Sequence, residues 1–110
     1  MPTTFKHEVK TQIGVTPVDI VQVPSGFRTT VVGLNLANTT DYDTINIDVY
    51  VISEDSVEAV YVRGITIPPN TAVKVITGGE KLILPETAGL RVKSDTENSV
   101  DAVISYVEIS

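Results

Sequence analysis

Side chains that could perform chemistry are few and widely spaced in this chain of 110 residues. It contains one histidine, His7, and neither cysteine nor tryptophan. A hydrolytic triad would need this imidazole as its base, together with a positioned nucleophile and an orienting acid. No Gly-x-Ser-x-Gly segment supplies a nucleophile, and His7 stands in an alternating segment near the N-terminus. We therefore expect His7 to have a surface or packing role, and we predict no catalytic residue.

Acidic residues could act as a catalytic pair across a sugar-binding cleft. They gather near two loops, with Asp41, Asp43 and Asp48 in the first and Glu54, Asp55 and Glu58 in the second. Glycosidases use two carboxylates, but sugar sites also rely on flat aromatic platforms, and tryptophan is absent. Acidic residues are common in the turns of β-proteins. The pattern favours solvated loops, and the protein is predicted not to be an enzyme.

A structural calcium ion is the alternative use of these acids. Hard cations bind several oxygen atoms from loops, and Asp41 with Asp43, or Asp95 with Glu97, could provide some of them. No EF-hand spacing or glycine-rich repeat accompanies these residues. We predict no metal and no cofactor, with Asp41 and Asp43 as the ligands if an ion is present.

Two further features have a possible binding role. The pair Gly78-Gly79 lacks the following helix and the Gly-Lys-Ser/Thr of a phosphate loop, so it predicts a hairpin turn. Tyr42, in a polar loop, and Tyr50, on the polar side of a strand, are candidate interface residues, because amphipathic aromatics are favoured at protein interfaces. The alternative that these tyrosines simply cover the edge of the fold stays open.

The elements that must position all these residues are strands. Val, Ile and Thr account for 43 of the 110 residues, whereas Ala, Leu and Met together number 11. Residues branched at Cβ fit a pleated, half-buried surface, and good helix formers are scarce here. Composition therefore predicts an all-β protein.

The alternation of apolar and polar residues predicts about eight short strands with turns at roughly ten-residue intervals. The clearest period of two runs over 45–52, whose expected inward residues are Ile45, Ile47, Val49 and Val51. In 29–37, the expected inward residues are Val32, Leu34 and Leu36. This spacing is typical of an antiparallel β-sandwich of the jelly-roll or immunoglobulin-like kind.

Some positions within the sandwich can also be predicted. The run 18–23 is bounded by prolines, which suits an edge strand, and 100–109 is apolar on both faces, which suits a central one. Segments 34–51 and 90–107 repeat the order strand, polar turn, longer strand, and we interpret them as two ordinary hairpins rather than as a duplicated unit. The length fits one domain, residues 1–110, in which residues 1–14 are either a first strand or an arm that reaches a neighbour.

Charge argues against two classes of partner. The 14 acidic and 8 basic residues give a net charge of −6, whereas nucleic acids and anionic membranes require a basic face. No signal-peptide pattern and no apolar stretch of about 18 residues is visible. We predict binding neither to nucleic acid nor to membrane.

An ordered series of turn and strand motifs covers residues from about 23 to the end of the chain. The motifs are Val23-Pro24-Ser25-Gly26, a strand ending in Asn38, Gly64-Ile65-Thr66-Ile67-Pro68-Pro69-Asn70-Thr71, Leu82-Ile83-Leu84-Pro85, Leu90-Arg91-Val92-Lys93, and Val103-Ile104-Ser105-Tyr106-Val107-Glu108-Ile109. This series resembles that of small β-sandwich virion proteins of tailed bacteriophages. Residues 1–14 lie outside the resemblance.

The resemblance implies a structural protein of a phage virion, made in the host cytoplasm. It implies that the protein decorates or cements the capsid by non-covalent binding to the major capsid protein or other virion proteins, as a homo-oligomer. Two alternatives stay open, namely a tail or neck accessory protein and a carbohydrate-binding or adhesin-like sandwich module.

Overall fold

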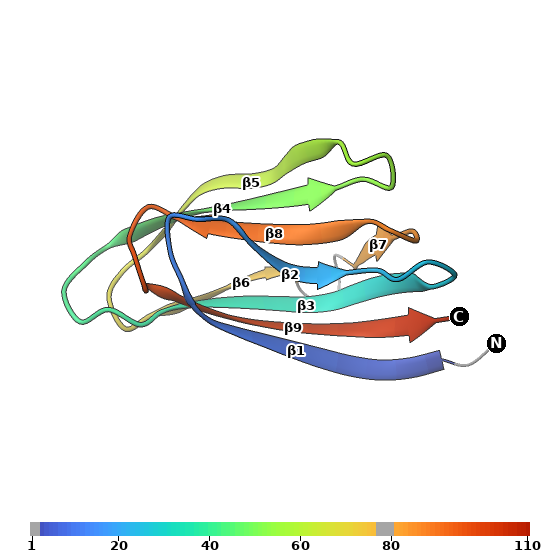
Figure 1. The fold of residues 1–110 in the computed structure, drawn as a ribbon. Coiled ribbons are helices and arrows are strands. Elements are labelled where there is room, and N and C mark those ends of the chain that lie inside the picture. Colours follow the sequence, from blue (N-terminus) through green and yellow to red (C-terminus); the bar gives the residue numbers. More distant parts are fainter. Residues whose placement is uncertain (1–2, 77–80) are drawn as a thin grey trace.

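The chain folds into two antiparallel β-sheets packed face to face (Figure 1). The computed structural model describes residues 3–76 and 81–110, which contain nine strands. The strands are β1 (Thr3–Ile13), β2 (Val18–Gln22), β3 (Arg28–Asn38), β4 (Ile45–Ile52), β5 (Glu58–Ile67), β6 (Ala72–Ile76), β7 (Leu82–Leu84), β8 (Gly89–Ser94) and β9 (Val100–Ile109). The predicted all-β sandwich is confirmed, with one strand more than the approximate count. The predicted Gly78-Gly79 turn lies outside the described residues.

The two sheets have different sizes and both are fully antiparallel. The five-stranded sheet has the order β1-β9-β3-β6, and β7 also pairs with β3. The four-stranded sheet has the order β2-β8-β4-β5. As expected, the proline-bounded β2 is an edge strand and β9 is central. Both ends of the described chain lie at the same end of the sandwich (Figure 1). No helix that could span a membrane occurs within the described ranges.

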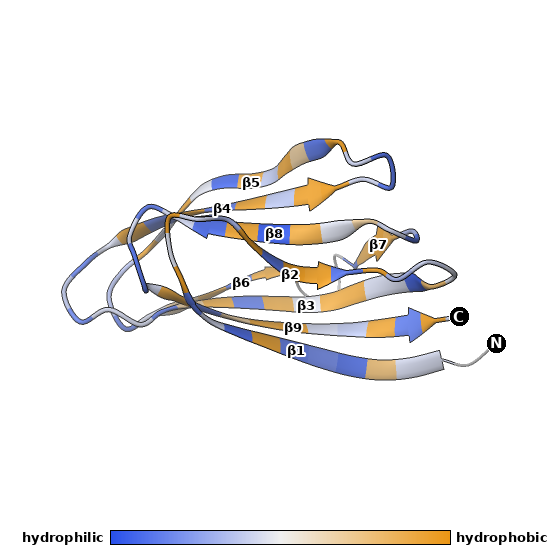
Figure 2. Ribbon diagram, viewed as in Figure 1, coloured by the Kyte–Doolittle hydropathy of each residue, from blue (hydrophilic) through white to orange (hydrophobic). Residues whose placement is uncertain are grey.

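The inward faces of the two sheets share one apolar core. The largest fully buried side chains are Ile13, Ile20, Val23, Leu34, Leu36, Ile45, Ile47, Ile67, Ile76, Leu84, Leu90 and Ile104. In β4, Ile45, Ile47 and Val49 are buried as predicted, and Val51 packs against the core while partly exposed. Hydrophobic and hydrophilic segments alternate along the core strands (Figure 2). Burying each such side chain stabilises the fold by about 1.5–3 kcal/mol, so this alternation holds the two sheets together.

The predicted inward face of β3 is wrong at one residue. Leu34 and Leu36 are buried as expected, but Val31 points into the core in place of Val32. The register of β3 against β9 shifts between Val31 and Gly33. A bulge inserts an extra residue into one strand, so the strict period of two that placed Val32 inward does not continue through it.

The interpretation of segments 34–51 and 90–107 as ordinary hairpins is also wrong. Strands β3 and β4 belong to different sheets, as do β8 and β9. At the first crossing, the buried side-chain amide of Asn38 donates hydrogen bonds to the carbonyl oxygens of Asp43 and Ile67, at 2.8 and 2.9 Å. The chain can therefore turn away from one sheet and join the other without leaving buried polar groups unpaired.

Candidate binding face

An uncovered apolar surface lies on the side of the five-stranded sheet that points away from the core. The strand pairings align Phe5 of β1 with Val107 of β9, Val107 with Thr30 of β3, and Thr30 with Ile83 of β7. Directly opposed residues of antiparallel strands point to the same face of a sheet. Phe5 is 82% exposed and Ile83 is 71% exposed. This row therefore crosses four strands, with the exposed Phe5 and Ile83 at its two ends and the half-buried Val107 between them.

A second row runs parallel to the first. Val9 of β1 opposes Val103 of β9, which opposes Asn35 of β3, which in turn opposes Lys74 of β6. Val9 is 51% exposed and Val103 is 39% exposed. We call the apolar members of the two rows the apolar face; its residues are Phe5, Val9, Ile83, Val103 and Val107. The row of His7 and Ser105 lies between the two apolar rows. Exposed apolar surface of this kind, bordered by polar residues, is typical of an interaction site.

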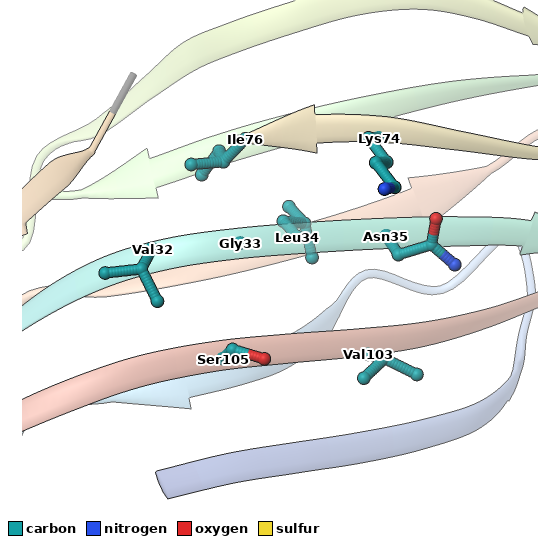
Figure 3. Close-up of a pocket in the computed structure, with 8 residues that line it drawn as sticks. All are labelled: Val32, Gly33, Leu34, Asn35, Lys74, Ile76, Val103 and Ser105. Carbon is teal, nitrogen blue, oxygen red and sulfur yellow. The ribbon is translucent and has the colours of Figure 1, made fainter. Parts of the chain in front are cut away.

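A shallow groove of about 270 Å³ adjoins the second row (Figure 3). Its walls are residues 32–35 of β3, Lys74 and Ile76 of β6, and Val103 and Ser105 of β9. Lys74 and Asn35 lie beside each other at one end, and Val32 lies toward the other (Figure 3). The groove contains Gly33 at the bulge of β3, where the missing side chain leaves space.

The groove offers binding groups, namely an amine, an amide and a hydroxyl around apolar walls. Within residues 3–76 and 81–110, no group of three or more His, Cys, Asp or Glu side chains is placed to hold a metal ion. His7 lies opposite Ser105 in the pairing of β1 with β9, on the same exposed face. The arrangement fits a partner that inserts an apolar side chain and places polar or acidic groups near Lys74.

The two candidate interface tyrosines lie elsewhere. Tyr42 is 92% exposed in the loop between β3 and β4, and Tyr50 lies on the outward side of β4 in the four-stranded sheet. The Tyr50 hydroxyl donates a hydrogen bond to Asp48 at 3.1 Å, and partial burial together with this carboxylate raises the pKa of Tyr50. Neither tyrosine belongs to the apolar face, so their role in an interface stays a prediction.

The acids considered as calcium ligands mostly hold turns. The main-chain oxygen of Asp43 accepts the Asn38 amide, and the Glu97 carboxylate accepts the backbone N–H of Val15 at 3.0 Å. The Asp95 carboxylate accepts the backbone N–H of Asn46 at 3.1 Å, and this bond lowers the pKa of Asp95. Asp41, the other candidate ligand, is exposed in the loop before β4.

Sequence reasoning missed the apolar face, because it assigned the apolar residues of each strand to the core. A signal was present in the last strand, where apolar residues occupy both faces. Val103 and Val107 there lie on the side opposite to the buried Ile104 and Tyr106. Apolar residues on both faces of a strand indicate either a fully covered strand or an uncovered binding surface.

Comparison with known proteins finds similar folds among solved structures. No family model and no curated protein matches the chain. Among solved structures, a protein from Bacillus endospore appendages, described as disulfide-linked pili, aligns with a TM-score of 0.55 and 8% identity over 98% of this chain and 88% of its own. At that identity the likeness shows a shared β-fold alone.

Two structures from infectious bursal disease virus are also similar. The Gt strain structure aligns with a TM-score of 0.47 and 8% identity, over 97% of this chain and 32% of its own. The virus-derived T=1 particle aligns with a TM-score of 0.46 and 9% identity, over 97% of this chain and 35% of its own. The chain spans about a third of the length of each viral chain.

Proposed function

We propose that the chain is a non-catalytic structural subunit that binds neighbouring proteins through its apolar face. The single observation that carries this proposal is the set of exposed apolar side chains that β1, β9 and β7 present on one side of the five-stranded sheet. Covering Phe5, Val9, Ile83 and Val103 with a partner would remove apolar area from water. Such burial is the usual driving force for stable association.

The groove supports recognition of a particular partner surface. A partner side chain that enters between Val32 and Val103 would contact apolar walls, and its backbone would reach Asn35 and Lys74 at one end. Interfaces commonly combine such an apolar centre with a polar rim. These features require no chemical step and no cofactor.

We further propose that the assembly is the virion of a tailed bacteriophage, in which the protein decorates or cements the capsid. The series of motifs from residue 23 onward, which resembles small phage virion proteins, supports this placement. The shared fold with a subunit of endospore pili is compatible with a role in a protein assembly. A tail or neck position would use the same face and is the alternative placement.

The test adds the purified chain to tailed-phage particles that were assembled without it. Co-sedimentation measures binding, and electron microscopy locates the added density on capsid, tail or neck. Ile83→Lys is expected to weaken binding at least about tenfold, because it places a charge among apolar side chains that the partner would cover. The matched control is Val57→Lys, since Val57 is 61% exposed in the turn before β5 and lies outside the apolar face.

Equal binding by Ile83→Lys and the wild-type chain would contradict the apolar face as the contact surface. Density confined to the tail or neck would replace the capsid placement with the alternative one. Failure of the wild-type chain to bind any part of the particle would contradict the virion role altogether.

A further inference from the structure

Strand β1 presents a free backbone edge. Of the strands that the structure describes, β9 is the one that pairs with β1, so the other side of β1 carries open N–H and C=O groups. Regular pairing with β9 continues to Lys10, and the register shifts between Lys10 and Ile13. A long exposed edge can accept a further strand by backbone hydrogen bonding.

The residues on either side of His7 in β1 have complementary properties. On the outward side, Phe5 and Val9 stand at equal distances from His7 and are both apolar. On the inward side, Lys6 and Glu8 flank His7 and carry opposite charges. When two copies of a strand pair in antiparallel fashion about a two-fold axis, residues at equal distances from the axis face each other.

We propose that two copies of the chain associate by antiparallel pairing of their β1 strands, with His7 on the two-fold axis. Lys6 of each copy then faces Glu8 of the second copy, and Phe5 faces Val9 of the second copy. Opposite charges and apolar pairs at directly opposed positions stabilise antiparallel strands. The inference goes beyond the proposed function and does not depend on binding to a virion.

Charge selects this register over its neighbours. A two-fold axis perpendicular to the sheet keeps every side chain on its own face, so the axis must pass through a residue position. An axis at Lys6 would bring Lys6 against its own copy. An axis at Glu8 would bring Glu8 against its own copy and Lys6 against Lys10. Like charges in direct opposition destabilise strand pairing.

An axis at Val9 also pairs opposite charges, but the backbone disfavours it. That register extends the pairing into the irregular end of β1, where Gln12 has a φ of 55°. The backbone N–H of Gln12 is already bonded to the Asp101 carboxylate at 3.1 Å. The register centred on His7 therefore combines opposite charges with the regular part of β1.

Charged residues that point inward can instead protect an edge from association. In the single chain, Lys6 contacts Glu108 with an Nζ–Oε1 distance of 2.9 Å, and Tyr106 lies beside Glu8, 3.5 Å from its carboxylate. Pairing adds a second carboxylate next to Lys6, so each charge meets an opposite one. Pairing also joins the apolar faces of the two copies, because Phe5 of one lies next to Val9 of the other.

A charge exchange tests the pairing. The purified wild-type chain is expected to sediment as a dimer, and Lys6→Glu and Glu8→Lys are each expected to weaken dimerisation at least about tenfold. An equimolar mixture of the two variants is expected to recover the dimer, because each variant then supplies the charges that the other needs. Asp41→Lys, in an exposed loop, changes the net charge as Glu8→Lys does and is expected to have no effect.

A cysteine scan tests the register, and the chain has no cysteine of its own. His7→Cys places two thiols opposite each other across strands whose Cα atoms are about 4.5–5.5 Å apart, which suits a disulfide. Under mild oxidation we expect His7→Cys to form a covalent dimer. Val9→Cys lies on the same exposed face but opposite Phe5 of the second copy, so it should stay uncrosslinked.

Three results would overturn the inference. These are a wild-type chain that stays monomeric up to roughly 0.1 mM, a variant mixture that does not recover the dimer, and crosslinking of Val9→Cys as fast as that of His7→Cys. A monomeric wild-type chain would identify Lys6 and Glu8 as edge-protecting charges. None of these measurements involves particles, so they leave the test of the proposed function separate.

Discussion

At the scale of single residues, two strand glycines have opposite surroundings. A Cβ on Gly89 would lie 2.6 Å from the backbone oxygen of Val21, which is too close for any side chain. A Cβ on Gly33 would lie 3.9 Å from its nearest neighbours, Ile76 O and Ser105 Cβ. Gly89 therefore permits β2 and β8 to approach, whereas Gly33 leaves space in the groove.

The same substitution is thus expected to have different effects at the two positions. Gly89→Ala should lower the free energy of unfolding by about 1–3 kcal/mol, because the backbones of β2 and β8 must separate. Gly33→Ala should leave it unchanged or raise it by a few tenths of a kcal/mol, because alanine has less conformational freedom in the unfolded chain. Urea unfolding of both variants measures the difference, and equal losses would contradict the steric argument.

Residue types predicted where a side chain lies within its own loop or strand, but not which distant residues share a surface with it. The loop position of Tyr42 and the outward position of Tyr50 followed from turn residues and from the period of two. The apolar face could not be predicted in the same way. Phe5, Ile83 and Val103 are far apart in the sequence and share one side of a sheet through long-range strand pairings. The apolar residues on both faces of β9 were the one local signal of that exposed surface.

At the scale of elements, the turn between β8 and β9 depends on Asp95. Its carboxylate accepts hydrogen bonds from the backbone N–H of Asn46 at 3.1 Å and from the Thr96 hydroxyl at 3.0 Å. These bonds tie the turn to the start of β4. The backbone hydrogen bond from Asn46 is the main cause of the lowered pKa of Asp95.

Asp95→Ala is expected to lower the free energy of unfolding by about 0.5–1.5 kcal/mol at neutral pH, the usual contribution of such hydrogen bonds. Because the folded-state pKa of Asp95 is lowered, its contribution is present above the unfolded-state pKa and is lost as the pH falls through the folded-state value. The stability difference between wild type and variant should therefore shrink below about pH 4. Asp95→Asn, which keeps the shape, is the matched control, and a difference that persists in acid would contradict the charge-based account.

The positions of the strands could be predicted from the sequence, whereas the strands with which they pair could not. Alternation in 45–52 and apolar character on both faces of 100–109 gave β4 and the central β9 correctly. The bulge at 31–33 was not predicted, because one inserted residue reverses the side of the sheet to which the neighbouring side chains point and leaves the composition of the strand unchanged. The crossings after β3 and β8 escaped it because a polar turn can either reverse a strand or send it to the other sheet.

At the scale of the whole molecule, the first and last strands of the chain are neighbours in one sheet. Strand β1 pairs with β9 along most of its length, and its inward residues Thr4, Lys6 and Glu8 remain exposed. β1 therefore contributes backbone hydrogen bonds to the sheet and the exposed side chains of Phe5 and Val9 to the apolar face. Its one residue in the hydrophobic core is Ile13, at its end. The strand extends the apolar face beyond β9 and covers the edge of β9.

Removal of residues 1–10 tests this division of roles. We expect the shortened chain to unfold in a single transition with a free energy of unfolding lower by about 1–3 kcal/mol, since it loses strand pairing but keeps the buried Ile13. Glu108, which is 9% exposed, also loses its contact with Lys6. The newly exposed edge of β9 should make the shortened chain aggregate, which light scattering at several concentrations would detect. Lys6→Ala removes the ion pair while it keeps β1, and it should reproduce a smaller loss without aggregation. A shortened chain that is unfolded in the absence of denaturant would show that β1 is required for the core to form.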